Sequence, residues 1–351
     1  MKIVKRLFQG IGVIIGILAL YLLVIAVVPG LDVPGQPLVQ TEQFTKGGDT
    51  KPPSSRKEVS FKANGTPVSA WLYLPEDLSA PVPCIIMGHG FGGTKDMGLE
   101  RYALRYLEAG FAVLLFDYRH FGESAGEPRH LIWIPYQLED WSAAIEYARG
   151  LKEINPAKIA LWGTSFSGGH VIVTAAHDES IACVSAQCPG LDGHASGEML
   201  FERVGIGYLL RMMMHGQRDM VRSWLGLSPH KIPIAGKPGS IAFLTTPDAY
   251  ASFKELVPDN FRNEACARIL LRADKYRPVK QAKDVRCPVL LQVCEHDAFT
   301  PISAAEETER QLGRYAEAIY YPIGHFDIYT GDNFEKAVSD QLAFFTRHLT
   351  P

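Results

Sequence analysis

Residues 159–176 read IALWGTSFSGGHVIVTAA, and the expected architecture follows from the turn that they contain. An apolar run typical of a buried strand stops at Gly163, Ser165 follows two residues later, and helix-like sequence begins almost at once. A serine hydroxyl attacks a carbonyl only when a base removes its proton and preset donors stabilise the oxyanion. A sharp turn from strand to helix exposes the serine oxygen and points backbone N–H groups, including that of Phe166, at the oxyanion. Such a turn has no room for large side chains two residues on either side, which explains Gly163 and Ser167.

Strand-like and helix-like segments alternate along the chain on both sides of this turn. Residues 58–75 predict an antiparallel hairpin with Asn64 and Gly65 at its turn. Unbroken apolar strands that alternate with helices form a mostly parallel sheet covered on both faces. The predicted strands cover residues 83–90, 111–119, 158–163, 181–189, 287–297 and 315–322, and the predicted helices cover residues 96–110, 138–150, 168–177 and 333–349.

The turn at Ser165 resembles the nucleophile elbow of the α/β-hydrolase superfamily, whose sequence is Gly-x-Ser-x-Gly. In this chain Ser167 replaces the second glycine, and Gly168 and Gly169 follow it. The resemblance covers residues 59–349, apart from the details of one insertion, and is strongest to bacterial esterases and to dienelactone-hydrolase-like and serine-peptidase-like members. It implies an α/β-hydrolase fold with a mostly parallel eight-stranded sheet and helices on both faces. It also implies hydrolysis through an acyl-serine intermediate, with no cofactor and no metal.

Members of the superfamily carry the nucleophile, an acid and a histidine in this order along the chain. Asp297 follows a predicted strand and precedes Pro301 by four residues, and His325 lies in a Gly-flanked loop before the last predicted helix. The resemblance implies that His325 takes the proton of Ser165, while Asp297 fixes the imidazole tautomer and stabilises the imidazolium. Three neighbours are rival candidates for these roles: Glu295, His296 and Asp327.

The sequence MGHGFGGTKD at residues 87–96 resembles the glycine-rich loop that follows the third strand of many esterases and lipases. Its glycines, Gly90 among them, let the backbone approach a ligand closely, and the resemblance implies that the N–H of Phe91 is the second oxyanion donor. Phosphate binding is the alternative function of such a loop, but neither a GK[ST] sequence nor dinucleotide-binding spacing is present. A further segment, residues 116–129, resembles an architectural turn of the superfamily, in which Asp117, Arg119 and Gly122 form a buried ion pair or a turn.

Residues 7–29 carry no charge and are long enough to cross a hydrocarbon core of roughly 30 Å as a helix. Lys2, Lys5 and Arg6 precede this run, and the next basic residue after it is Lys46. The positive-inside tendency predicts a single-pass anchor with a cytoplasmic N-terminus and a periplasmic or extracellular catalytic domain. A cleaved secretory signal is the alternative, although no small-x-small site and no lipid-accepting cysteine follows the run.

The composition excludes several other classes of protein. With 47% hydrophobic residues and 21% charged residues, the chain of 351 residues can bury a large core. A net charge of -3 and the lack of basic runs beyond the N-terminus argue against nucleic acid as a partner. The six cysteines lack metal-binding spacing, and we expect them to be buried thiols, Cys266 in a helical stretch and the others near strands. Cys188 and Cys294 end predicted strands and are expected to lie near one another without forming a disulfide.

The alternation of strands and helices lapses between about residues 190 and 285, where an insertion of this size predicts a helical cap or lid. Leu209 and Met213 belong to a Leu- and Met-rich helix that lines an acyl pocket, packs in an ordinary core, or faces the membrane; the sequence does not separate these three interpretations. We divide the chain into a cytoplasmic tail (1–6), a transmembrane anchor (7–29), a linker (30–56), a core in two parts (57–189 and 286–351) and the cap (190–285).

These motifs predict a serine hydrolase that cleaves carboxylic esters of small to medium acyl substrates with a Ser-His-Asp triad. One alternative is an aminopeptidase or amidase of the same fold, and another is a non-catalytic binding module that retained the fold. As an enzyme, the protein acts on a small-molecule ester or amide and contacts the membrane through its N-terminal helix. We expect its rate to rise through roughly pH 6 to 7 as His325 loses its proton.

Overall fold

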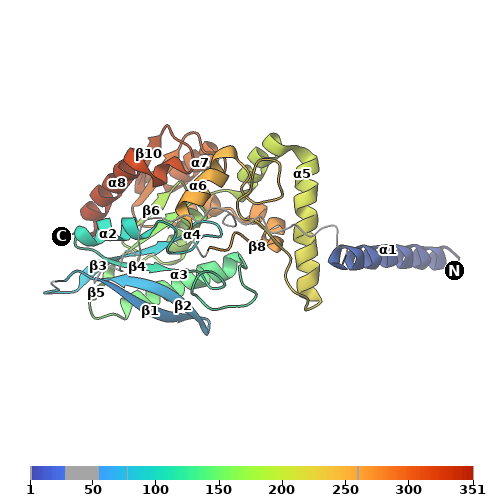
Figure 1. Cartoon of the computed structure of the whole chain (residues 1–351), viewed down its shortest axis with the longest axis horizontal. Helices are drawn as coiled ribbons and strands as arrows, with labels where there is room; N and C mark the ends of the chain where they lie inside the picture. The colour runs from blue at the N-terminus through green and yellow to red at the C-terminus, as the bar shows by residue number, and fades with distance from the viewer. Residues whose placement is uncertain (1, 28–54, 77, 259–260, 351) are drawn as a thin grey trace.

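One eight-stranded sheet lies at the centre of the molecule (Figure 1). The computed structural model describes residues 2–27, 55–76, 78–258 and 261–350, so the predicted linker lies outside the described residues except for its last two. The antiparallel hairpin of β1 and β2 joins the sheet through β4, also antiparallel, and the remaining neighbours pair in parallel. The predicted mostly parallel sheet is therefore confirmed. Its strands, in spatial order, are β1 (Arg56–Ala63), β2 (Thr66–Tyr73), β4 (Ala112–Phe116), β3 (Val82–Gly88), β5 (Ile154–Thr164), β6 (Cys183–Gln187), β9 (Val289–Cys294) and β10 (Ala316–Tyr321).

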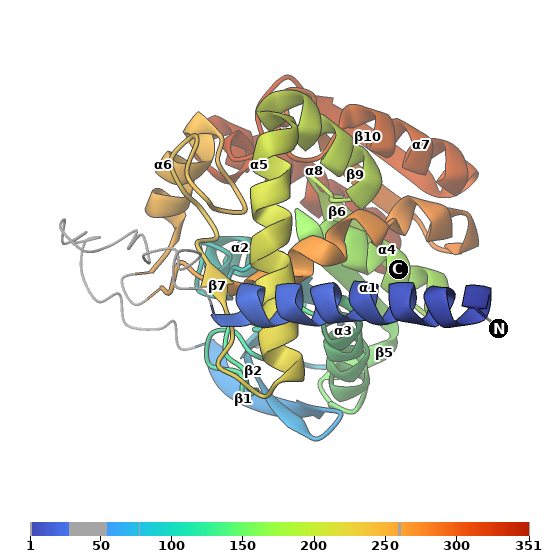
Figure 2. The ribbon, with the colours of Figure 1, turned by 90° about the vertical axis from the view of Figure 1, so that its right-hand side faces the viewer.

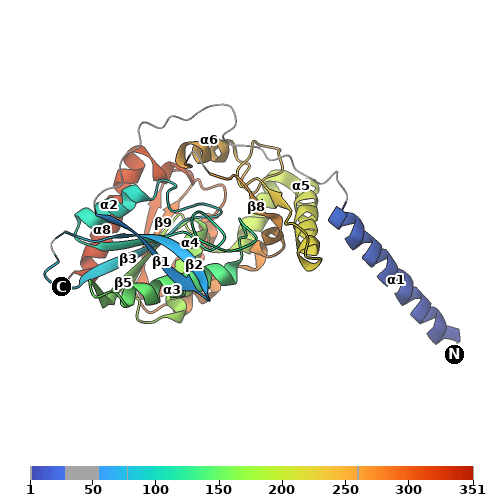
Figure 3. The ribbon, with the colours of Figure 1, turned by 60° about the horizontal axis from the view of Figure 1, so that its bottom comes forward.

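Helices cover both faces of the sheet and bury its alternating side chains. In β3, Ile85 and Met87 enter one apolar cluster, whereas Cys84 and Ile86 enter the other, as the period of two in a strand requires. The first cluster is covered by α2 (Glu100–Glu108) and α8 (Gly331–Leu349), and the second by α3 (Ile134–Arg149) and α4 (Phe166–His177) (Figure 3). Helix α7 (Ile302–Leu312) also packs on the second cluster.

The predicted hairpin is present, and its turn has the backbone that such a turn needs. Asn64 and Gly65 separate β1 from β2 with φ angles of 48° and 83°. Two central residues with positive φ match the right-handed twist of the flanking strands.

Between β6 and β9 the chain leaves the sheet, in the segment predicted as a cap. It forms the long helix α5 (Gly193–Trp224), which is kinked at Gly205, the short helix α6 (Pro247–Leu256), and a small antiparallel pair, β7 (Lys231–Ile232) with β8 (Ala265–Cys266). Three 3₁₀ helices at 267–271, 273–275 and 278–284 follow. The expectation that Cys266 lies in a helical stretch is wrong, because it pairs with Lys231 across β7 and β8.

Helix α1 (Lys2–Val27) leaves the body of the molecule, and in two perpendicular views it runs crosswise to α5 (Figures 1 and 2). Its residues Gln9–Val27 have a mean hydropathy of 2.9 and only 11% of them are buried. At about 1.5 Å per residue, this helix is long and apolar enough to be a membrane anchor or a signal sequence.

Candidate active site

Ser165 lies between the last residue of β5 and the first residue of α4, in a strained backbone conformation. Its φ is 56° and its ψ is -119°, which is uncommon for a residue with a side chain. Two hydrogen bonds to the end of β6 and the residues after it stabilise this turn. The Ser165 N–H donates to the Gln187 carbonyl at 2.8 Å, and the Ser165 carbonyl accepts from the Gly190 N–H at 2.7 Å. A Cβ atom at Gly163 would lie 2.3 Å from the carbonyl oxygen of Ser167, so the turn excludes any larger residue there.

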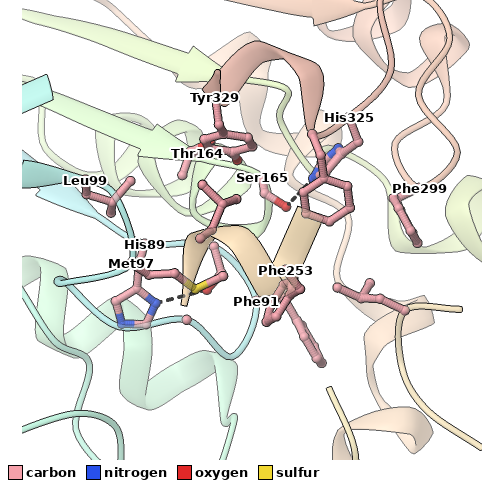
Figure 4. Close-up of a pocket in the computed structure, with 15 residues that line it drawn as sticks. His89, Phe91, Met97, Leu99, Thr164, Ser165, Phe253, Phe299, His325 and Tyr329 are labelled. Atoms are coloured by element: carbon pink, nitrogen blue, oxygen red, sulfur yellow. Dashed lines mark hydrogen bonds between the residues drawn. The ribbon is translucent and has the colours of Figure 1, made fainter. Parts of the chain in front are cut away.

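The structure brings Ser165, His325 and Asp297 together at the carboxyl edge of the sheet. His325 Nε2 lies 3.0 Å from Ser165 Oγ (Figure 4). On the other side of the ring, His325 Nδ1 lies 2.5 Å from Asp297 Oδ2. Asp297 also accepts hydrogen bonds from the N–H groups of Phe299 and Thr300 and from the Thr300 hydroxyl, at 2.7–2.9 Å. Since Nδ1 donates to the carboxylate, Nε2 is available to accept the serine proton.

The charges of this group depend on one another. Burial lowers the pKa of His325, but the Asp297 carboxylate, together with the nearby Cys188, outweighs burial and raises that pKa to about 9. For Asp297, burial raises the pKa, and the charge of His325 together with the Thr300 hydrogen bonds brings it below its ordinary value. The imidazolium form is therefore stabilised in the absence of a substrate, and activity is expected at a more alkaline pH than the range of 6 to 7 inferred from the sequence.

The three rival residues lie apart from Ser165. Glu295 and His296 are exposed to solvent. Asp327 is also exposed, and its carboxylate accepts from the Gly324 N–H at 2.8 Å, so it holds the loop that carries His325.

The glycine-rich loop after β3 approaches the serine closely. A Cβ atom at Gly90 would lie 3.0 Å from Ser165 Cβ, and the Phe91 ring packs edge to face on Phe166, with centroids 5.5 Å apart. Phe166 is the first residue of α4, so its N–H has no carbonyl partner within the helix. The loop and the helix end therefore place the two predicted donor residues side by side next to Ser165.

Ser167 has a role that its small size alone did not predict. Its hydroxyl donates to the carbonyl of His89 at 2.5 Å and accepts from the hydroxyl of Tyr118. Tyr118 in turn accepts from Trp141 Nε1 at 2.7 Å. This buried chain of hydrogen bonds joins α3, the segment after β4, the elbow and the glycine-rich loop.

Asp117 and Arg119 form buried ion pairs, but with partners that the sequence did not indicate. Lys95 Nζ lies 2.8 Å from Asp117, and Arg119 Nε lies 2.6 Å from Asp140. A Cβ atom at Gly122 would meet the Asp117 carboxylate at 2.2 Å, so this residue forms the tight turn around the pair. The segment supports the fold beside the site.

A narrow apolar cavity opens at Ser165 (Figure 4), with about 70 Å³ accessible to the centres of water-sized molecules. Leu244, Phe253 and Leu256 reach it from the segment between β6 and β9, and Tyr329 reaches it from the loop after His325. The predicted pocket residues Leu209 and Met213 are not among its lining residues, which is a correction: Tyr208 and Met212 turn inward on α5, so Met213 faces outward and is 46% exposed. The other lining residues are His89, Gly90, Phe91, Gly93, Met97, Leu99, Thr164, Phe299, His325 and Phe326.

Two thiols, those of Cys188 and Cys294, lie close to His325 and Asp297. Cys188 Sγ is 3.4 Å from the Tyr329 hydroxyl and 3.6 Å from the Thr164 hydroxyl. Burial raises the pKa of Cys188, but a hydrogen bond from Cys294 and the charge of His325 outweigh it and bring the pKa to about 6. All six cysteines are buried free thiols, as expected, and Cys188 and Cys294 are neighbours. In the part of the chain that the structure describes, no group of three or more His, Cys, Asp or Glu side chains forms a metal site.

The chain is similar to several known proteins. A family model described as X-Pro dipeptidyl-peptidase (S15 family) matches residues 64–209. The quorum-quenching protein AidA of Acinetobacter baumannii is 40% identical over 297 residues, which cover 84% of this chain and 96% of that protein. The crystal structure of the α/β hydrolase GrgF from Penicillium is similar with a TM-score of 0.69 and 26% identity, over 84% of this chain and 99% of GrgF. Est1E from Butyrivibrio proteoclasticus, solved with ferulic acid bound, shares the fold at 18% identity, with a TM-score of 0.57 over 84% of this chain and 100% of Est1E.

Proposed function

This chain belongs to the α/β-hydrolase superfamily, and on that premise we propose that it is a serine hydrolase that cleaves carboxylic esters. The observation that carries the proposal is the continuous contact from Ser165 Oγ to His325 Nε2 at 3.0 Å and from His325 Nδ1 to Asp297 at 2.5 Å. This contact supplies a nucleophile, a base and a group that orients the base, which together suffice for acyl transfer through serine.

The proposed reaction begins when Ser165 Oγ attacks the ester carbonyl and His325 Nε2 accepts its proton. The N–H groups of Phe91 and Phe166 stabilise the resulting oxyanion, helped by the dipole of α4. His325 then protonates the leaving alcohol as the carbon–oxygen bond breaks, which leaves an acyl-serine. A water molecule, deprotonated by His325, then attacks the acyl carbon. The bond from this carbon to Ser165 Oγ breaks, His325 returns the proton to Oγ, and the acid is released, while Asp297 stabilises the imidazolium at both stages.

The apolar walls of the cavity support an acyl substrate of small to medium size. Phe253 and Leu256 of α6 supply part of the wall, so we propose that the segment 190–285 acts as a cap that selects the acyl group. The narrow cavity favours short chains over long ones.

An amidase or aminopeptidase of the same fold is the second candidate. The match of residues 64–209 to the S15 peptidase family favours it. Paired ester and anilide substrates with the same acyl group distinguish the two, because only a peptidase-like site protonates a poor amine leaving group efficiently.

We further propose that α1 is an uncleaved anchor with its N-terminus in the cytoplasm, so that the catalytic body lies outside. The charge distribution supports this orientation, since the first basic residue after the helix is Lys46. Protease treatment of spheroplasts with a tag at either end of the chain tests it. Digestion of the C-terminal tag and protection of the N-terminal tag are expected, and the reverse pattern overturns the orientation.

Labelling with a fluorophosphonate tests the nucleophile directly. The full chain is expected to be labelled at Ser165 and to hydrolyse p-nitrophenyl butyrate, and Ser165→Ala is expected to lose both properties. Ser142→Ala, at an exposed serine of α3, is the matched control and keeps both. A folded wild-type protein that is neither labelled nor active overturns the hydrolase proposal and leaves a binding module.

A further inference from the structure

The last turns of α1 rest on the C-terminal part of α5, at residues 217–222 (Figure 2). The Tyr21 hydroxyl donates to Gln217 Oε1 at 2.5 Å, and Ile25 and Ala26 pack with Val221 in a small buried cluster. The end of the apolar helix therefore docks on one defined face of α5.

Two arginines of α5 complete this docking. Arg218 Nη1 donates to the carbonyl of Ile25 and Arg222 Nη1 to the carbonyl of Ala26, each at 2.8 Å. The last carbonyls of a helix have no partner within the helix, and such groups are costly when they remain unsatisfied near hydrocarbon. The two arginines thus donate hydrogen bonds to the last carbonyls of α1, at the level where a spanning helix leaves the bilayer.

The face of α5 that receives α1 continues as an apolar stripe on both sides of the contact. Spacings of three and four residues relate Ile206, Leu210, Met213, Gln217, Val221 and Trp224, so they share one side of the helix. Gln217 and Val221 meet α1, whereas the others remain exposed. We define the α5 stripe as Ile206, Leu210, Met213, Met214 and Trp224, whose exposed fractions are 60%, 53%, 46%, 37% and 69%.

The position of the contact along α1 fixes the depth of this stripe. Val27, the last described residue of the apolar helix, lies six positions after Tyr21, which contacts Gln217. At 1.5 Å per residue this is about 9 Å, within the roughly 5–10 Å by which interfacial amphipathic helices enter a bilayer. Because α1 runs crosswise to α5, a bilayer around α1 extends along the length of the stripe (Figures 1 and 2).

The charges near the stripe also fit a lipid surface. Arg211 is exposed at one edge of the stripe, and Arg218 and Arg222 follow it at helical spacing, Arg218 being buried against the end of α1. The single acidic residue of α5 after Gly205 is Asp219, which is buried and pairs with Arg268 on the inner side. Cationic side chains beside an apolar stripe, with an exposed tryptophan near the helix end, are typical of a helix that binds anionic headgroups.

We propose that the α5 stripe lies in the headgroup region of the bilayer that α1 spans, with lipid as its occupant. The membrane thus holds the body of the protein in one orientation through two elements, a spanning helix and a helix parallel to the surface. The proposal rests on the membrane anchor proposed above and is independent of the hydrolase activity.

Tryptophan quenching by brominated lipid tests the position of the stripe. The full chain is placed in nanodiscs of phosphatidylethanolamine and phosphatidylglycerol whose acyl chains carry bromine near the headgroup, near the chain end, or nowhere. Trp224 is one of five tryptophans, so contact with bromine near the headgroup is expected to remove about a fifth of the emission. Trp224→Phe is expected to abolish this loss, and Met213→Glu to reduce it. Ile302→Glu, at a 36% exposed apolar residue outside the stripe, is the matched control and leaves the loss unchanged.

Three outcomes overturn the proposal in different ways. Equal quenching of the wild type and Trp224→Phe shows that the stripe does not touch lipid. Absent quenching together with a chemically cross-linked dimer shows that a second copy of the chain covers the stripe. Release of the full chain from membranes by alkaline carbonate shows that α1 is not a membrane anchor, and the proposal then fails. Fluorophosphonate labelling of Ser165 still tests the hydrolase proposal separately.

Discussion

Replacing Ser167 with alanine removes the hydroxyl that joins the elbow to the loop after β3. The Tyr118 hydroxyl then loses its acceptor and the His89 carbonyl loses its donor, and both residues are 2% exposed or less. An unsatisfied buried polar group costs about 1–3 kcal/mol. With two such groups, we expect the free energy of unfolding to fall by about 2–4 kcal/mol, the lower part of the summed range, because Tyr118 still accepts from Trp141.

The loss is also expected to reach the reaction, because His89 precedes the loop residues Gly90 and Phe91. A loosened oxyanion donor lowers kcat while substrate binding, and with it KM, stays nearly constant. We expect kcat for p-nitrophenyl butyrate to fall about tenfold, equivalent to about 1.4 kcal/mol in the barrier.

Urea unfolding of the full chain in detergent and steady-state kinetics measure the two effects on the same samples. Ser142→Ala removes an exposed hydroxyl and is expected to stay within about 0.5 kcal/mol of the wild type. In a double-mutant cycle, Tyr118→Phe is expected to cost less in the Ser167→Ala background, by about 1–2 kcal/mol, since the orphaned hydroxyl is gone. A Ser167→Ala protein as stable as the Ser142→Ala control refutes the reasoning.

The remaining predictions concern the pH dependence, the elbow and the thiols. We expect kcat/KM to rise with pH, with the midpoint of the rise near pH 9, because only the neutral imidazole of His325 accepts a proton and the pKa of His325 is about 9. A midpoint near pH 6.5 contradicts the influence of Asp297 on this pKa. Cys188→Ala is expected to move this midpoint to lower pH, because Cys188 helps raise the pKa of His325, and an unchanged profile shows that the thiol is electrostatically silent. Gly163→Ala is expected to cost about 3 kcal/mol in urea unfolding, because the new methyl meets a carbonyl oxygen at 2.3 Å, whereas Gly197→Ala in α5 meets nothing within 4 Å and keeps the stability. Thiol titration of the denatured, unreduced protein is expected to count six groups, and a lower count reveals a disulfide.

The sheet and the serine turn could be predicted because their signals are local. The period-two alternation in residues such as Ile85 and Ile86 and the small residues around Ser165 follow from backbone geometry within a few positions. The order along the chain and the loop context predict His325 and Asp297, and in the structure His325 contacts Ser165 with one ring nitrogen and Asp297 with the other.

Features that depend on distant packing did not have such a signal. Helix α7 was not predicted, because its inner face consists largely of Ala304, Ala305 and Thr308, which give a weak apolar periodicity. The pocket residue Phe253 belongs to a segment without regular alternation, so nothing in its neighbourhood indicated which way it faces. Leu209 and Met213 show a related difficulty: an apolar helix face is compatible with a pocket wall, with core packing or with a membrane contact, and in the structure neither residue lines the cavity, while Met213 is exposed.

The distance along the chain between Ser165 and His325, 160 residues, has a consequence for the synthesis of the protein. The ribosome makes the elbow well before the loop that carries the imidazole. A nascent chain that stops before His325 therefore has at Ser165 a hydroxyl without its basic neighbour. The contact between the two side chains forms only after this loop has been translated and has folded back onto the sheet.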